Sequence, residues 1–322
     1  MSRSTENQSS HDSEAPRMTS VEDGELTMVP TRHPGRTVAS IILIILTAML
    51  VQNLFANKNF QWDVVRKYFF SSSVLQGLGA TIELTVLSMV IGIVLGIGLA
   101  VMRQSANPIV SRLALLYIWF FRGTPLLVQL IFWFNLSALY PKLSLSVPFG
   151  PQIVSGSANA LITPFIAALL GLALNEAAYM AEIVRGGLLG VPRGQAEAAS
   201  AIGMHPGLAM RRIILPQAMR IIVPPTGNQI IGMLKTTSLV SVIATQELLY
   251  SVQLIYARTF ETIPLLIVAC LWYLIVTTVL SIGQHFVEKR LGRSVGEPTR
   301  LNLRRRNAVL VSDLRDGERE GM

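Results

Sequence analysis

The chain of 322 residues has little of what a soluble enzyme needs. Charged residues make up only 14% of it and hydrophobic residues 51%, whereas soluble domains carry about 25% charged residues. The mean hydropathy is +0.49. A single cysteine, Cys270, excludes a disulfide framework. Because long apolar runs account for the shortage of charge, the composition indicates an integral membrane protein.

Catalytic and metal-binding patterns are missing as well. The four histidines are scattered and none has the spacing of a metal site, and no Gly-x-Ser-x-Gly elbow occurs. None of the five lysines follows a glycine, so there is no Gly-x4-Gly-Lys-Ser/Thr loop for nucleotide phosphates. We therefore predict no catalytic residue, no metal site and no cofactor held by this chain.

Six apolar stretches are long enough to cross a bilayer, the first of them only marginally. The sequence therefore predicts an all-α integral membrane protein with about six transmembrane helices. The predicted spans are 38–56, 76–102, 113–139, 164–184, 217–245 and 263–286.

The segments outside these spans differ in character. Residues 1–36 and 291–322 are polar and are predicted to be disordered tails. Residues 57–75 mix aromatic and charged side chains, which is typical of an amphipathic helix at the outer membrane interface. Segments 140–163 and 247–262 are predicted to be loops. This division sets the first span, 37–56, apart from a membrane core at 76–290.

Three local patterns modify the spans. The second contains the pair Gly92-x3-Gly96, which lets two helix backbones approach closely. The third is interrupted by the run Phe-Arg-Gly-Thr-Pro at 121–125. The fifth is predicted to break at Pro224-Pro225, because these residues remove backbone donors.

Charge placement fixes the expected topology. With the N-terminus in the cytoplasm and six spans, the inner segments hold 20 of the 27 Lys and Arg residues and the outer segments hold five. This bias predicts that both termini lie in the cytoplasm, as does the segment between the fourth and fifth spans. The net charge of +8 then reflects topology and attraction to anionic membrane lipid, and we predict no binding to nucleic acid.

Polar residues inside the spans are the candidates for contact with a transported solute, because they are costly there. Glu176 stands out, since it lies near the middle of the fourth span. The alternative is a protonated or salt-bridged glutamate that only packs helices, with Arg122 or Lys235 as the partner in a salt bridge. Arg122 itself can pair with a carboxylate, bind lipid phosphate or reach the surface. A hinge or simple kink is the alternative for the fifth-span residues. The candidates for the solute pathway are Asn175, Glu176, Tyr179, Asn228, Gln229, Lys235, Thr236, Thr237, Ser238, Arg122 and, more weakly, Glu83.

The segment 197–216 predicts a helix, a break and a second short helix. Residues 196–202 are good helix formers, and Gly203 is suited to end that helix. The run His205-Pro206-Gly207 prevents its continuation, and Pro216 fits the first turn of the next span.

The same segment has the spacing Glu-Ala-Ala-x3-Gly-x9-Ile-x-Leu-Pro. It resembles the cytoplasmic EAA loop of permease subunits of bacterial ATP-binding-cassette (ABC) importers. Three further runs resemble the polar amino acid permeases within that family, and the resemblance covers about 76–290. They are FRGTPLLVQL at 121–130, NEAAYMAEIVRGG at 175–187 and LKTTSLVSVIATQELL at 234–249.

The resemblance implies a five-span core, to which the span at 37–56 is an addition. It also implies two cytoplasmic ATPase subunits that bind ATP and Mg²⁺, a second permease of the same or a homologous chain, and an extracytoplasmic amino-acid-binding protein. The loop at 185–217 would couple the permease to the ATPases. Its matching residues are Glu197, Ala198, Ala199, Gly203, Ile213, Leu215 and Pro216.

The function implied is a permease of an ATP-driven importer that moves a polar amino acid across the bacterial cytoplasmic membrane by alternating access. Two alternatives remain open. One is an ABC permease for another small solute, such as an opine or an organic anion. The other is an ion-coupled secondary carrier, which would usually show an internal two-fold repeat that we do not see. The amino acid carried is not determined by the sequence.

Overall fold

The computed structural model describes residues 34–146 and 152–292. Most of the predicted tail at 1–36 and nearly all of that at 291–322 lie outside these ranges. The described residues fall into two units, and the boundary lies between Asn57 and Lys58. The first unit contributes one helix, α1 (Pro34–Ala56). Its segment Val38–Ala56 has a mean hydropathy of 2.3, so the first predicted span is a helix long enough to cross a bilayer.

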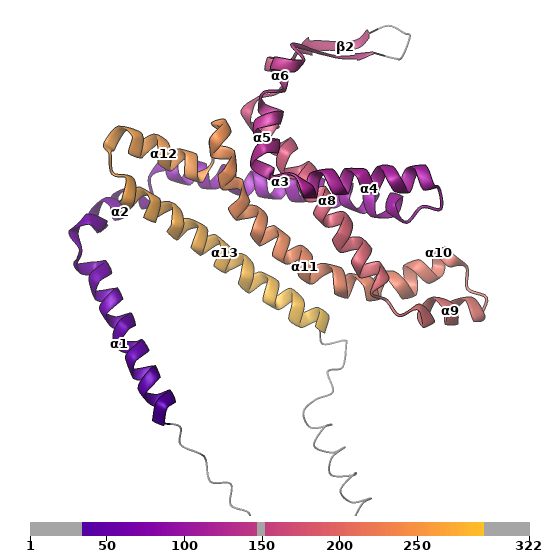
Figure 1. Ribbon diagram of the computed structural model, residues 1–322, viewed down its shortest axis with the longest axis horizontal. Coiled ribbons are helices and arrows are strands. Elements are labelled where there is room, and N and C mark those ends of the chain that lie inside the picture. Colours follow the sequence, from indigo (N-terminus) through magenta and orange to yellow (C-terminus); the bar gives the residue numbers. More distant parts are fainter. Residues whose placement is uncertain (1–33, 147–151, 293–322) are drawn as a thin grey trace, which may run out of the picture. The chain divides into compact units, whose positions relative to one another are not determined.

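The second unit is almost entirely helical (Figure 1). Among the described residues, four helices are long and apolar enough to cross a membrane, or six spans if each of two bent helix pairs is counted as one. This confirms the predicted fold class. The elements are η1 (Lys58–Phe60), α2 (Trp62–Phe69), α3 (Ser72–Arg103), α4 (Pro108–Gly123), α5 (Leu126–Phe134), α6 (Leu136–Leu139), β1 (Lys142–Ser146), β2 (Gln152–Ser157), α7 (Ala158–Leu161), α8 (Pro164–Leu189), α9 (Arg193–Ala201), α10 (Pro206–Ala209), η2 (Met210–Ile214), α11 (Leu215–Thr236), η3 (Thr237–Ile243), α12 (Leu248–Thr259) and α13 (Thr262–Gly292).

Helices α3 and α8 form the most extensive contact between any two described elements. The glycine pair of the second span lies in this contact, as its spacing predicts. A Cβ atom on Gly96 would lie 2.5 Å from Met180 Cβ and 3.0 Å from the Ala177 carbonyl oxygen. The missing side chain therefore lets the two backbones touch, which is how membrane helices gain packing energy in the absence of water.

The interrupted third span is the bent pair α4 and α5, whose axes differ by 101°. The bend at Thr124–Pro125 leaves backbone oxygens without helical partners. The buried amide of Gln129 donates to the carbonyl oxygens of Phe121 (3.0 Å) and Thr124 (3.2 Å). Asn175 on α8 also donates to the Phe121 oxygen, at 2.9 Å. Buried side-chain amides thus replace the hydrogen bonds that the break removes.

The fifth span corrects one prediction. Helix α11 runs through Pro224 and Pro225 without a break, and the α-helix ends a full three turns later. Proline removes a backbone donor, but its fixed φ angle suits a helix. The side chain of Gln284 on α13 also donates to the Pro224 oxygen, at 3.3 Å. The helix turns into the 3-10 segment η3 and ends at Ala244, which has a φ of 56°.

Two predicted loops also contain regular structure. Segment 247–262 was expected to be irregular, but α12 occupies most of it. The carboxylate of Glu247 begins this helix by accepting hydrogen bonds from the backbone amides of Leu249 and Tyr250. Segment 140–163 contains the antiparallel pair β1–β2 and the short helix α7, with 147–151 outside the described residues.

Substitution of Gly96 tests the α3–α8 contact. Because its neighbours are backbone atoms and a Cβ, Gly96→Ala should destabilise the protein by roughly 1–3 kcal/mol. A Cβ on Gly98, two residues further along α3, meets nothing within 4 Å. Gly98→Ala is the matched control and should be neutral or stabilising by up to about 1 kcal/mol. Thermal unfolding in detergent compares the two variants, and equal midpoints would contradict the assigned packing.

Candidate functional site

The buried carboxylate of Glu176 lies in the contact between α3 and α8. Glu176 is the thirteenth of the 26 residues of α8, so it lies about 19 Å from either end of the helix. Only 4% of it is exposed. The side-chain amide of Gln229 on α11 donates to both carboxylate oxygens, at 3.3 Å each. No ion pair to Glu176 occurs among the described residues. The sequence alternatives of a partner in Arg122 or Lys235 therefore do not hold.

Helix α3 leaves room for this carboxylate. Gly92 faces it, and a Cβ atom there would lie 2.8 Å from Glu176 Cγ. One turn earlier on the same face lies Ser88, whose side chain is fully buried. The hydroxyl oxygen of Ser88 has no hydrogen-bond partner among the described residues. Ser88 therefore lies on the helix that packs against Glu176, one turn from Gly92, and it was not among the candidates chosen from the sequence.

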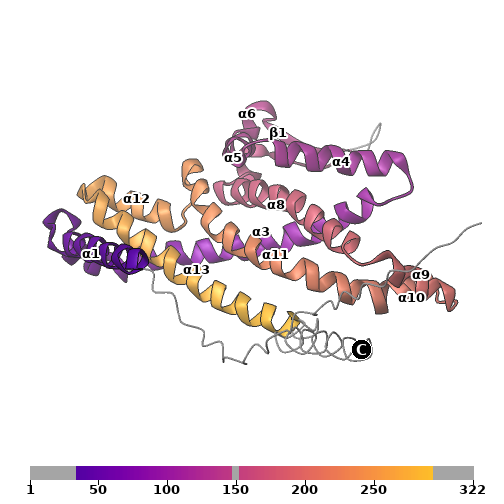
Figure 2. The same ribbon diagram turned by 60° about the horizontal axis from the view of Figure 1, so that its bottom comes forward.

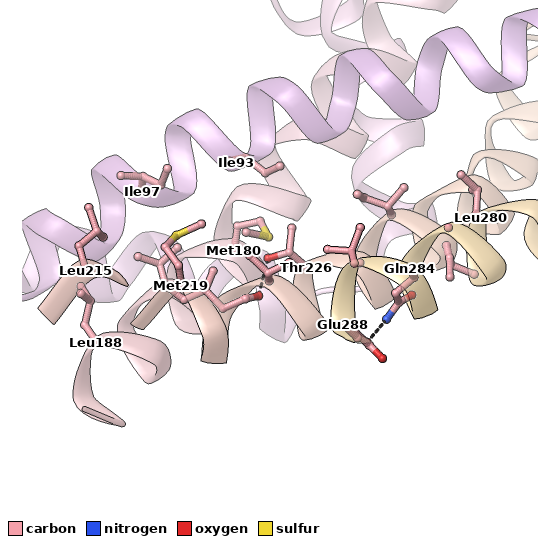
Figure 3. A pocket seen from close by; sticks show the side chains of 18 of the residues that line it. Ile93, Ile97, Met180, Leu188, Leu215, Met219, Thr226, Leu280, Gln284 and Glu288 are labelled. Atoms are coloured by element: carbon pink, nitrogen blue, oxygen red, sulfur yellow. Dashed lines mark hydrogen bonds between the residues drawn. The ribbon is translucent and has the colours of Figure 1, made fainter. Parts of the chain in front are cut away.

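A cavity of about 1140 Å³ lies among α3, α8, α11 and α13 (Figure 3). Its walls are mainly aliphatic, and its few polar lining groups include Thr226, Gln284 and Glu288. Glu176 and Gln229 do not line it. Their neighbours do, because Met180 lies one turn from Glu176 on α8 and Ile230 follows Gln229 on α11. The cavity therefore reaches to within one helical turn of the buried carboxylate.

Three other candidates on α4 and α8 have different surroundings. The Asn175 amide contacts the α4–α5 break, at Phe121 and at Gln129 Oε1 (3.2 Å). Tyr179 is 38% exposed, and its ring lies under the Arg122 guanidinium, 5.3 Å from Cζ to the ring centroid. Arg122 pairs with Glu182 on α8, at 3.9 Å. Tyr179 and Glu176 therefore have different partners, although they are only three residues apart on α8.

Among the candidates on the fifth span, only Gln229 contacts Glu176. Asn228 is exposed and accepts a hydrogen bond from Gln284 at 3.0 Å. Thr236, Thr237 and Ser238 direct their hydroxyls to carbonyl oxygens three or four residues earlier, where α11 passes into η3. The remaining two candidates, one at the end of α11 and the other on α3, are exposed. They are Lys235 and Glu83.

The predicted EAA loop, residues 185–217, has the expected helix, break and helix. Helix α9 ends at Ala201, and Gly203, two residues later, has a φ of 74°. The Met204 amide donates to the Ala199 oxygen and the Gly203 amide to the Ser200 oxygen. This pair of bonds is the Schellman ending, in which glycine supplies the left-handed residue. His205 then begins α10 by accepting from the Gly207 amide at 3.3 Å.

The return to the fifth span confirms the prediction for Pro216, which is the second residue of α11 and so lies in its first turn. Helix α10, the π-helical turn η2 and α11 follow one another in continuous helical conformation. The π-helical turn η2 ends directly before Leu215 and Pro216, and this proline has no backbone donor to contribute. In Figures 1 and 2, α9 and α10 lie together at the ends of α8 and α11. Gln217 on α11 donates to Gln195 Oε1 on α9 at 3.3 Å.

The loop presents one part to solvent and buries another. Glu197 and Ala198 are exposed, whereas Ala199 is buried. Ile213 is half-buried, and Leu215 and Pro216 are exposed.

Glu247 is a buried polar residue that the sequence analysis did not single out. Its side chain is fully buried and accepts a third hydrogen bond, from the Tyr273 hydroxyl of α13 at 2.9 Å. The adjacent Leu248 amide donates to Thr81 on α3 at 3.0 Å. One carboxylate thus joins α12 to α13 and holds the helix start that packs on α3. An acidic residue directly before an apolar run was the only signal in the sequence.

Comparison with known proteins identifies the class. Residues 92–293 match the family of binding-protein-dependent transport system inner membrane components, so the chain belongs to this family. The match covers the helices around Glu176 and the whole EAA loop. Family membership decides between the two classes left open by the sequence, in favour of binding-protein-dependent transport and against an ion-coupled carrier. Family membership also shows that this chain is a multi-pass protein of the inner membrane.

Three relatives illustrate the similarity. The chain is 49% identical to an arginine transport system permease protein of Corynebacterium glutamicum, with 81% of each chain covered. It is 38% identical to a nopaline transport system permease protein of Agrobacterium fabrum, over 65% of this chain and 83% of that one. Among solved structures, an amino acid ABC transporter with histidines matches with 35% identity and a TM-score of 0.58, over 68% of this chain and 94% of that one.

Replacing Glu247 tests its structural role. Glu247→Ala leaves two backbone amides and a tyrosine hydroxyl without an acceptor. We expect a loss of roughly 2–4 kcal/mol of stability. Glu83→Ala is the matched control, because this glutamate is exposed on α3 and should change stability by less than about 0.5 kcal/mol. Thermal unfolding in detergent compares them, and an unchanged midpoint for Glu247→Ala would refute the assigned role.

Proposed function

We propose that this chain is the permease of an ATP-driven importer and that its cargo is a polar amino acid with a cationic side chain, such as arginine. The observation that carries the proposal is the buried Glu176, which accepts hydrogen bonds from one side-chain amide, that of Gln229, and has no cationic partner among the described residues. A carboxylate without a cationic partner is costly inside a membrane protein. An ammonium or guanidinium group of a bound amino acid would supply that partner.

The neighbouring cavity supports this assignment. It opens between helices whose ends carry the EAA loop and reaches within one turn of Glu176. Apart from Glu288 on α13, the lining offers a cation no carboxylate, so Glu176, one turn beyond the cavity wall, is the other position at which a charged solute would pause. We propose that Glu176 and Gln229 bind the cargo directly, that Ser88 contributes a hydrogen bond, and that Asn175 acts through the α4–α5 break. Lys235, Thr236, Thr237 and Ser238 would shape the end of α11.

The EAA loop is proposed as the coupling element. Helix α9 offers an exposed surface with Glu197 and Ala198 at its centre, suited to a groove on a cytoplasmic ATPase. Ala199 and Gly203 would hold the shape of the helix. Ile213, Leu215 and Pro216 would carry its movement into α11. ATP and Mg²⁺ would bind to the ATPase, because this chain has no phosphate-binding loop.

The assembly that fits this role contains two ATPase subunits, a second permease of the same or a homologous chain, and an extracytoplasmic binding protein. Both termini would lie in the cytoplasm, in agreement with the distribution of Lys and Arg. ATP binding would bring the two ATPases together, and the coupling helices would move with them. Such rearrangement alternates the access of the central site between the two sides of the membrane.

A second cargo class has support from a specific observation. The nopaline permease relative is 38% identical, so an opine is the competing candidate. An uptake assay should therefore include nopaline as a competitor of arginine. Strong competition by nopaline together with weak uptake of arginine would favour the opine.

The test of the central site is the variant Glu176→Gln in the reconstituted transporter. Glutamine keeps the shape and the hydrogen bond to Gln229 but removes the charge. If Glu176 binds a cation, the apparent affinity for labelled arginine should fall at least about tenfold. If Glu176 only packs helices, uptake should be unchanged, and the proposed site would be wrong.

Glu83→Gln is the matched control, since it removes a carboxylate from an exposed position on α3. It should leave arginine uptake within about twofold of the wild type. Co-purification of the ATPase with both variants shows that each is folded and assembled.

A further inference from the structure

A pocket of about 600 Å³ lies on the other side of α8 from the large cavity. Three arginines line it from three different helices, and we call it the arginine pocket. Arg103 is the last residue of α3, Arg122 lies near the end of α4, and Arg185 lies on α8. Glu182 and Tyr179 complete the charged and aromatic part of the wall.

The charges in this pocket do not balance. Arg185 forms a two-point ion pair with Glu182, at 2.6 Å and 3.3 Å. Arg122 reaches the same carboxylate at only 3.9 Å, and Arg103 donates instead to the Ser111 hydroxyl, at 2.9 Å. Within the described ranges, the pairs of Glu182 with Arg185 and with Arg122 are the only ion pairs. Three guanidinium groups therefore share one carboxylate, which leaves an excess of two positive charges.

Another part of the pocket wall is apolar. Leu115 and Ile118 line it together with Trp119, of which 68% is exposed. Arginine forks bind phosphate oxygens through two parallel hydrogen bonds. Tryptophan next to such a group is typical of the level of lipid headgroups. A phosphate whose own molecule also carries apolar chains fits both parts of this wall.

The cytoplasmic end of the pocket lies at the appropriate level of the membrane, and Arg122 reaches towards it from deeper, since the neighbouring Phe121 contacts Asn175 near the middle of α8. Arg103 ends α3, and α8 ends four residues after Arg185, at the start of the EAA loop. The distribution of Lys and Arg puts these helix ends on the cytoplasmic side, where anionic lipids attract basic groups. We propose that the arginine pocket binds the phosphate of an anionic phospholipid from the inner leaflet, with Arg122 and Arg185 as its main ligands.

The test measures lipid retention, and it needs no transport. The full transporter is purified, exchanged into nanodiscs of phosphatidylcholine with a small fraction of phosphatidylglycerol, and its bound lipid is measured by mass spectrometry. The wild type should retain phosphatidylglycerol at least about tenfold better than the double variant Arg122→Gln, Arg185→Gln. Arg258→Gln on α12, outside the pocket, is the control and should retain lipid like the wild type.

Two outcomes would overturn the proposal. Equal retention by the wild type and the double variant would show that the pocket holds no lipid. Displacement of the retained lipid by millimolar inorganic phosphate would show that a free anion is the ligand.

A second measurement covers the case in which the double variant does not fold. Brominated phosphatidylglycerol should quench the fluorescence of Trp119 in the wild type more strongly than brominated phosphatidylcholine. Subtracting the signal of Trp119→Phe isolates this residue. Equal quenching by the two lipids would also refute the proposal.

Discussion

The close contact of α3 with α8 is the constraint on which the rest of the protein depends. Two glycines make it possible, and each has a different consequence. Gly96 brings the helix backbones together, whereas Gly92 leaves space for the side chain of Glu176. A bulkier residue at either place would separate the helices or displace the carboxylate. The helix packing and the position of Glu176 therefore both depend on the small residues of α3. Small residues are common at contacts between membrane helices, because they allow close van der Waals packing.

A second close contact connects this centre to the EAA loop. Gly187 near the end of α8 faces Ile222 on α11, and a Cβ atom at Gly187 would also lie 3.3 Å from the Ala218 oxygen. The two helices that enter and leave the loop thus touch directly beside it. The same two helices carry Glu176 and Gln229. Under the proposed coupling, a displacement of α9 would pass through residues 190–192 into α8, and through residues 202–205 and α10 into α11.

Much of this could be read from the sequence, and the failures have physical causes. The apolar spans, the Gly92-Gly96 contact, the interruption at 121–125 and the ending at Gly203 all follow from local chemistry. The prediction of a break at Pro224-Pro225 was wrong. Proline lacks the donor for a helical hydrogen bond, but its fixed φ angle is compatible with a helix, and α11 continues through both residues. Helix α12 was missed because Glu247 and its partners on α3 and α13 are far apart in the sequence. Tyr179 lies about one turn from Glu176 on α8, yet the two have different partners, because Tyr179 contacts Arg122 on α4 and Glu176 contacts Gln229 on α11.

The most direct test of the account is the ATPase activity of the reconstituted transporter, wild type against Glu197→Lys. Arginine-loaded binding protein should stimulate ATP hydrolysis by the wild type, and the reversed charge on α9 should abolish this stimulation or release the ATPase. Stimulation that survives the substitution would contradict the role of α9. If no ATPase associates with the wild type at all, the assignment of this chain as the membrane part of an ATP-driven importer would be wrong.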